Sequence, residues 1–192
     1  MSRWEPNTVE RLQDAAMTLF QERGYSDVTV ADIAEHAGVT KRTFFNHFTD
    51  KREVLFAGAT ALEKQVELDI LGSDAGQPAI DLAISALARA GQTLSNYSET
   101  ARLRRDVIAS SPELQERSLI KMAALSRVIA AALIARDRHT PHAALVAESA
   151  VTVFGTAYAA WADSPASPFS ELMHTVLAEL KAAIGATAPG SP

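Results

Sequence analysis

Residues 39–51 read VTKRTFFNHFTDK, and this stretch decides how the rest of the chain is interpreted. It combines cationic, hydroxyl and amide side chains with three phenylalanines. A buried segment has no need of so many polar groups, and a solvated face has no need of the rings. At helical spacing, Phe44 and Phe48 are four residues apart and share one face. We expect that face to be buried, so a helix over 40–47 would have two chemically different sides.

The opposite side of this predicted helix carries groups that can read DNA. Arginine can bind the O6/N7 edge of guanine, asparagine the N6/N7 edge of adenine, and apolar atoms can pack on a thymine methyl. A solvated helix face is the plainer alternative. The two-sided pattern favours a recognition helix in the major groove. The outward positions are Lys41, Arg42, Phe45 and Asn46, flanked by Thr43 and His47.

The segments before this helix complete a helix-turn-helix pattern. Apolar residues at helical spacing predict a first helix over 7–23. Thr29 with Asp32 is a capping-box pattern at the start of a second helix, over 29–36. Gly38 then supplies the sharp turn that such units place between two helices.

The rest of the chain also reads as helix, which predicts an all-α fold. Alanine and leucine are abundant, and no run of β-branched residues alternates with polar ones. Prolines recur where a first helical residue belongs. The predicted helices span 7–23, 29–36, 40–47, 50–71, 78–97, 99–109, 112–137, 141–162 and 168–184.

Composition narrows the class of protein. The 192 residues suit one or two small domains, and an apolar fraction of 47% can form a core. There is no cysteine, so neither a disulfide framework nor a thiolate zinc site is present. The first residues lack the apolar core of a signal peptide, and the longest apolar run, 128–135, is too short to span a bilayer. We expect a cytoplasmic protein that does not enter the membrane.

Charge distribution says more about a partner than net charge does. A net charge of −5 argues against a general nucleic-acid binder. Residues 41–52, however, hold four lysines and arginines against Asp50 alone. One short basic segment therefore lies in an acidic chain, as a localised DNA contact would require.

Residues 15–56 read AAMTLFQERGYSDVTVADIAEHAGVTKRTFFNHFTDKREVLF, and they closely resemble the DNA-binding domain of the tetracycline-repressor (TetR) family. The resemblance rests on the order of LFQERGY, TVADIAEHAGV and TFFNHFTDK. It implies a helix-turn-helix DNA-binding domain over 1–52 and a helical-bundle domain for ligand binding and dimerisation over 53–184. We expect the tail, 185–192, to be disordered.

The resemblance also implies roles for individual residues. Thr29 is expected to contact the DNA backbone, and Lys51 is expected to bind a DNA phosphate. Phe45 stands where the family commonly has a tyrosine whose hydroxyl meets phosphate, and Arg42 where a small residue or proline is common. Arg42 is therefore expected to read a base that many relatives ignore. The residues in or beside the groove are Lys41, Arg42, Thr43, Phe45, Asn46 and His47.

Three partners follow from the resemblance: a double-stranded DNA operator, a second copy of the chain and a small-molecule effector of unknown identity. Family members pair through their last two helices, predicted here over 141–162 and 168–184. Internal core is the alternative for the small and apolar residues expected there, which are Ala143, Ala147, Ala150, Val151, Phe154, Gly155, Ala159, Leu172, Val176, Leu177 and Leu180. Two half-sites one DNA turn apart need a two-fold dimer, with recognition helices roughly 34–36 Å apart. Most members are repressors released by the effector, and we expect the same here. An activator and a ligand-independent regulator are the alternatives.

The effector pocket is predicted only in outline. Aromatic and apolar residues could line it, and arginines could bind an anionic effector. The C-terminal half also resembles actinobacterial-type family members thought to sense acyl-CoA-like molecules. The alternatives are an ordinary core for the first group and ion pairs with Asp106 or Glu99 for the second. The candidates are Tyr97, Arg102, Met122, Phe154, Tyr158 and Trp161.

A long fourth helix over 50–71 would join the DNA-binding domain to the ligand-binding domain. Our hypothesis is that effector binding moves this helix and changes the spacing between the recognition helices.

Little in the sequence favours an enzyme. Glu171-x-x-His174 is a pattern that di-iron bundles use twice, and it occurs once here. His139 and His142 lack a third ligand nearby in the sequence. There is no glycine-rich phosphate loop and no nucleophile elbow. We predict no catalytic residue, no metal and no cofactor.

Overall fold

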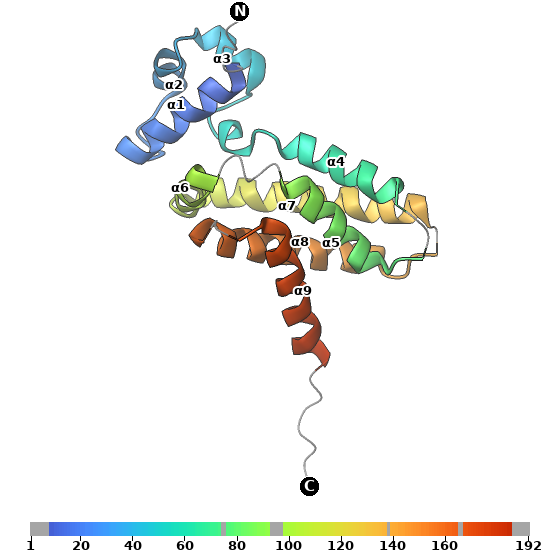
Figure 1. The fold of residues 1–192 in the computed structure, drawn as a ribbon. Helices are drawn as coiled ribbons and strands as arrows, with labels where there is room; N and C mark the ends of the chain where they lie inside the picture. Colours follow the sequence, from blue (N-terminus) through green and yellow to red (C-terminus); the bar gives the residue numbers. More distant parts are fainter. Residues whose placement is uncertain (1–7, 74–75, 93–97, 138, 165–166, 186–192) are drawn as a thin grey trace, which may run out of the picture. The chain divides into compact units, whose positions relative to one another are not determined.

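The computed structural model describes residues 8–73, 76–92, 98–137, 139–164 and 167–185. Every regular element in these ranges is helical, in agreement with the predicted all-α fold (Figure 1). The elements are α1 (Thr8–Arg23), α2 (Val30–His36), α3 (Lys41–His47), the 3-10 helix η1 (Glu53–Phe56), α4 (Ala59–Leu71), α5 (Ala79–Ala90), α6 (Ser98–Ala109), α7 (Pro112–Arg136), α8 (Ala143–Asp163) and α9 (Phe169–Gly185).

The chain divides into two compact units. The first contains residues 1–60 and 100–120, and the second contains 61–99 and 121–192. The first unit therefore contains the predicted DNA-binding segment, 1–52, together with η1, most of α6 and the first turns of α7. The reason is packing, because apolar side chains of these added segments lie in the core of the first unit.

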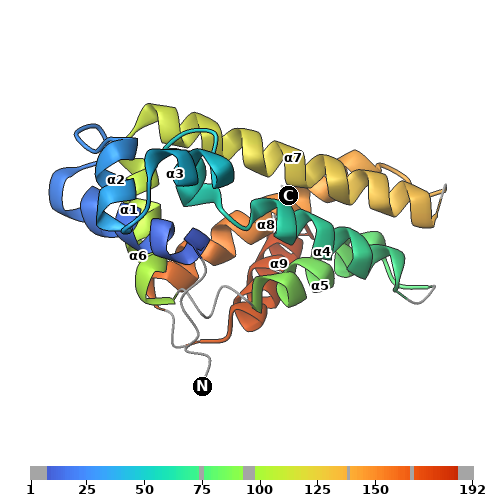
Figure 2. The ribbon, with the colours of Figure 1, turned by 90° about the horizontal axis from the view of Figure 1, so that it is seen from above.

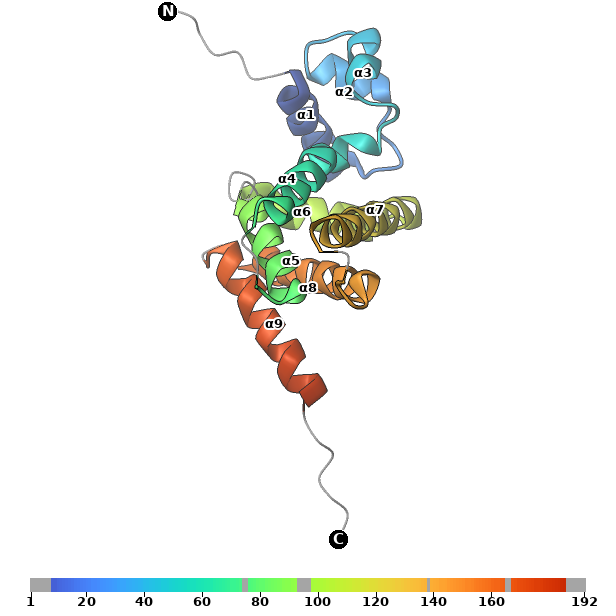
Figure 3. The ribbon, with the colours of Figure 1, turned by 90° about the vertical axis from the view of Figure 1, so that its right-hand side faces the viewer.

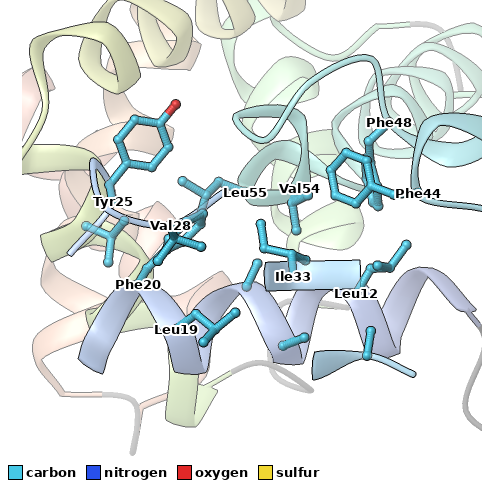
Figure 4. Close-up of a cluster of buried hydrophobic side chains, with 14 of the residues drawn as sticks. Leu12, Leu19, Phe20, Tyr25, Val28, Ile33, Phe44, Phe48, Val54 and Leu55 are labelled. Atoms are coloured by element: carbon cyan, nitrogen blue, oxygen red, sulfur yellow. The ribbon is translucent and has the colours of Figure 1, made fainter. Parts of the chain in front are cut away.

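The core of the first unit joins elements that are distant in the sequence (Figure 4). Val54, Leu55 and Phe56 of η1 are buried in it, together with Val107 of α6 and Leu114 of α7. The helix-turn-helix residues buried in the same cluster include Leu12, Leu19, Phe20, Tyr25, Val28, Ile33, Phe44 and Phe48.

In the second unit α5, α8 and α9 pack against one another (Figures 2 and 3). Phe169, at the start of α9, is buried with its ring edge-on to Phe154 and Trp161, at centroid distances of 5.5 and 6.0 Å. Gly91, which ends α5, lies so close to this ring that a Cβ there would overlap it. The last turn of α5 therefore packs closely against the ring of Phe169.

The single helix predicted over 50–71 is wrong. The carboxylate of Asp50 accepts hydrogen bonds from the backbone N–H groups of Arg52, at 2.8 Å, and Glu53, at 3.3 Å. These bonds start the short η1. Gly58 then has a φ of +88°, a left-handed conformation that interrupts the helix before α4 begins.

Other boundaries agree within a few residues, apart from the helix predicted over 78–97. Its first part is α5, which ends at Ala90, and residues 93–97 lie outside the described part of the chain. Most of the predicted tail, 186–192, also lies outside it. Pro112 is the first residue of α7, as predicted.

Judged by length and composition alone, α7 and α8 are each apolar enough to cross a membrane. This is weak evidence, because the core helix of a soluble protein passes the same test. Both helices bury side chains in the second unit, among them Ile129 of α7 and Val153 of α8.

Candidate nucleic-acid interface

The helix α3 owes its start to Thr40. The Thr40 hydroxyl accepts a hydrogen bond from the backbone N–H of Thr43 at 3.0 Å, which satisfies one of the donors that a helix start leaves free. The helix ends at Phe48, whose backbone is extended. These two caps fix the length of α3 and hence which side chains share each face.

The three phenylalanines of α3 lie as the sequence predicts. Phe44 is fully buried and Phe48 is 8% exposed, with their ring centroids 5.5 Å apart. Phe45 is 56% exposed, although its ring stands edge-on to that of Phe44. A large apolar ring thus lies on the solvent side of α3.

The remaining predicted contacts surround Phe45 on the solvent side of α3. Thr43 is half-buried, and its hydroxyl lies 2.9 Å from that of Thr40. The first unit thus presents cationic, amide, imidazole and aromatic groups on one short helix, as major-groove reading requires. The exposed members are Lys41, Arg42, Asn46 and His47.

The turn between α2 and α3 is held by an arginine that the sequence pattern did not single out. Gly38 has a φ of +67°, and the next residue donates from its backbone N–H to the carbonyl of Ala34 at 2.9 Å. The guanidinium of Arg11 donates to the carbonyls of Ala37 and Gly38. Because these carbonyls end α2, a cation there is favourably placed.

Thr29 forms the predicted capping box with Asp32. Its hydroxyl donates to the Asp32 carboxylate at 2.6 Å, and its backbone N–H donates to the same carboxylate at 2.8 Å. The hydroxyl bond is the main reason why the pKa of Asp32 lies below its ordinary value. The Thr29 proton that could bind a phosphate is therefore already used within the protein.

Lys51, predicted to bind a DNA phosphate, makes hydrogen bonds within the first unit. Its ammonium donates to the carbonyls of Tyr25 at 2.8 Å and Val28 at 2.9 Å, with Ser26 at 3.4 Å. It also lies 4.1 Å from the centroid of the Tyr25 ring. In this arrangement Lys51 ties together the loop between α1 and α2, and it is not part of the exposed face of α3.

Tyr25 and Asp50 belong to one polar cluster of the first unit. The Tyr25 hydroxyl is buried. Burial, and then the negative charge of Glu113, raise the pKa of Tyr25 to about 12. Hydrogen bonds from the Arg52 side chain hold the pKa of Asp50 below its ordinary value. Arg52 also pairs with Glu113 at 3.3 Å.

Three of the predicted effector residues, Phe154, Tyr158 and Trp161, lie on α8. Phe154 and Trp161 are buried in the cluster around Phe169, which agrees with the alternative that they form ordinary core. Tyr158 packs on Trp161 with ring centroids 6.0 Å apart. Tyr97 lies outside the described residues.

The other two pocket candidates belong to different compact units. Met122 is half-buried in the second unit. Arg102 belongs to the first unit, is 68% exposed and lies 3.9 Å from Asp106, so the ion-pair alternative describes it. A surface cavity of about 350 Å³ in the second unit contains none of the six candidates. It is lined by Leu68, Asp69, Gly72, Ser73, Gln77 and Arg89.

In the described part of the chain no three histidine or acidic side chains come together as a metal site. Glu171, His174, His139 and His142 are all exposed. The outward groups of α3 instead have the chemistry of a DNA-facing surface.

Two family comparisons cover most of the chain. Residues 12–57 match the family described as bacterial regulatory proteins, tetR family. Residues 77–185 match the family described as the MftR C-terminal domain, and this match alone spans more than half of the chain.

Curated relatives with the same kind of function match part of the chain. MftR of Mycobacterium tuberculosis (strain ATCC 25618 / H37Rv), named for the transcriptional regulation of mycofactocin biosynthesis, is 31% identical over 132 residues. That alignment covers 68% of this chain and 66% of MftR. The transcriptional regulator SrpR of Pseudomonas putida is 42% identical over 62 residues, which cover 32% of this chain and 29% of SrpR. The aligned regions therefore span less than two thirds of each relative.

A solved structure extends the likeness to the whole fold. FadR of Thermus thermophilus, described as a TetR-family transcriptional repressor in complex with lauroyl-CoA, superimposes with a TM-score of 0.53 at 20% sequence identity. The superposition covers 96% of this chain and 98% of FadR, and at that identity it concerns the fold alone. MftR, SrpR and FadR are all named as transcriptional regulators or repressors. The chain belongs to the tetR family of bacterial regulatory proteins, with a C-terminal domain of the MftR type.

Proposed function

We propose that this chain is a cytoplasmic transcriptional repressor that binds a palindromic DNA operator as a homodimer and is released by a small molecule. The observation that carries the proposal is the outward face of α3. Phe45 is 56% exposed there beside exposed Lys41, Arg42 and Asn46, while Phe44 is fully buried behind it. An exposed ring costs free energy in water unless a partner covers it.

The proposed DNA contacts follow from the chemistry of each exposed group. Arg42 would bind the O6/N7 edge of a guanine, and Asn46 would bind the N6/N7 edge of an adenine. Phe45 would pack on a thymine methyl, because it has no hydroxyl with which to reach a phosphate. Lys41 and His47, at the two ends of α3, would contact phosphates on either side of the groove.

A homodimer is supported by the outward faces of α8 and α9. Ala147, Ala150 and Phe154, which were expected at the interface, are buried within the chain. Each helix nevertheless has exposed small side chains, which allow close helix approach, beside exposed charged ones. Their threonine hydroxyls donate to the carbonyl four residues earlier in the same helix, at 2.9 to 3.0 Å, so they can be buried without losing a partner. The residues are Thr152, Gly155, Thr156 and Ala159 of α8 and Thr175, Ala178 and Ala182 of α9.

An acyl-CoA-like molecule is the effector class to test first. FadR of T. thermophilus, which has a similar fold, was solved with lauroyl-CoA. A ligand-dependent repressor should lose operator affinity when such a compound is added. A ligand-independent regulator would keep it.

The proposal is tested by selecting bound duplexes from a random DNA pool with the purified protein. We expect an enriched palindrome whose half-sites lie about one DNA turn apart. Recovery of no sequence over a range of salt concentrations would contradict the proposed function. An enriched single half-site would retain DNA reading and contradict the dimer.

A further inference from the structure

The segment that follows the recognition helix is attached to α6 and α7. η1 begins five residues after Phe48, the cap of α3, and its three apolar side chains are buried with Val107 and Leu114. Val54 and Leu55 are visible in this cluster in Figure 4. A shift of α6 or of the first turn of α7 would therefore carry η1 with it.

Two arginines add polar contacts to this packing. Arg117 of α7 pairs with Glu53 at 2.5 Å, and the Glu53 side chain is only 16% exposed. Arg104 of α6 donates to the carbonyl of Leu55 at 2.6 Å, and its guanidinium lies 5.5 Å from the ring centroid of Phe56. We call Arg104 and Arg117 the η1 anchor.

A third contact lies on the side of η1 that leads to α3. Arg52 forms ion pairs with Asp50 at 2.7 Å and with Glu113 of α7 at 3.3 Å. One exposed ion pair contributes little on its own. Here, however, the half-buried anchor and the ion pairs of Arg52 fix the same short segment, together with buried apolar side chains.

The connection from η1 to α4 is of a different kind. Ala57 is extended, with ψ at 137°, and Gly58 has a φ of +88°. Neither residue belongs to η1 or to α4. The backbone between η1 and α4 can therefore turn without breaking a helix.

We propose that Arg104 and Arg117 are positioning residues for the recognition helix, which is set from α6 and α7 through η1 and not from α4. This inference rests on the proposed function, since it concerns operator binding. It replaces the hypothesis of one rigid helix over 50–71. It also gives α7 a defined part in the response to the effector, because α7 starts in the first unit and runs to Arg136 in the second.

Charge reversal at the anchor tests the proposal. The probe is the palindromic duplex enriched by the wild-type protein, and the reference is an unrelated duplex of equal length. We expect Arg117→Glu to weaken binding to the palindrome at least tenfold, which corresponds to about 1.4 kcal/mol. Binding to the unrelated duplex should change less than threefold, because misplacing α3 affects reading more than charge attraction. The double variant Glu53→Arg with Arg117→Glu should return to within threefold of wild type.

The matched control is Arg127→Glu, which makes the same charge change at an exposed position on the same helix. It should leave palindrome affinity within threefold. Far-UV circular dichroism and thermal unfolding show whether each variant is folded at the assay temperature. If Arg117→Glu is unfolded, Arg117→Met, which keeps the aliphatic stem, takes its place with the same expected loss.

The connection to α4 is tested by inserting one glycine between Ala57 and Gly58. We expect palindrome affinity to stay within threefold of wild type. A tenfold loss on insertion, or full affinity in the folded anchor variants, would overturn the proposal. A wild-type protein that enriches no duplex would instead contradict the proposed function, so the two failures are distinguishable.

Discussion

At the scale of single residues, the exposed guanidinium of Arg42 carries the most specific prediction. Arg42→Ala should cost about 1–3 kcal/mol of binding free energy on the selected palindrome and relax the preference at one operator position. The reason is that a bidentate guanine contact would be lost. Repeating the selection with the variant measures both effects. A uniform loss over all sequences would make Arg42 a phosphate contact.

Lys51 and Lys41 form a matched pair with opposite expectations. Lys51→Met should lower the free energy of unfolding by about 1–3 kcal/mol, because loop carbonyls that its ammonium now binds would lose a donor. The slope of log K against log salt should not change, since Lys51 faces the protein. Lys41→Met should leave stability unchanged and reduce the slope by roughly one phosphate contact. Urea denaturation and binding titrations at several salt concentrations separate the two results.

At the scale of elements, the contact between α5 and α9 depends on the absence of a side chain at Gly91. Gly91→Ala would place a Cβ against the buried ring of Phe169 and should destabilise the protein by about 1–3 kcal/mol. The control is Gly185→Ala at the end of α9, where a Cβ meets nothing within 4 Å. Thermal unfolding of both variants gives the comparison. Equal unfolding temperatures would contradict the packing described for α5 and α9.

The elements also show what the sequence could predict. The period of apolar residues is a local property, so the burial of Phe44 and Phe48 and the exposure of Phe45 followed from spacing alone. The hydrogen bonds of Lys51 could not be predicted from spacing, because its carbonyl partners lie more than twenty residues earlier in the chain. The interruption of the helix at Gly58 was also not predicted, because glycine is tolerated inside helical patterns. The turn there goes with the packing of η1 onto α6 and α7.

At the scale of the whole molecule, the small-residue faces of α8 and α9 make a prediction about assembly. Gly155 lies on the exposed face of α8, and a Cβ there would meet nothing within 4 Å in a single chain. Gly155→Leu should therefore leave one chain folded, and by helix propensity should favour α8. In a dimer with closely packed helices the same side chain would clash and separate the subunits.

Sedimentation velocity over a range of protein concentrations measures this outcome. We expect a dimer for the wild type and a monomer for Gly155→Leu at micromolar concentration. Ala131→Leu, at an exposed position of α7 outside the proposed interface, should remain dimeric. The monomeric variant should also lose affinity for the full palindrome while keeping its affinity for a single half-site, because each recognition helix is intact. If Gly155→Leu remained dimeric and bound the palindrome as the wild type does, the subunits would have to meet through another surface.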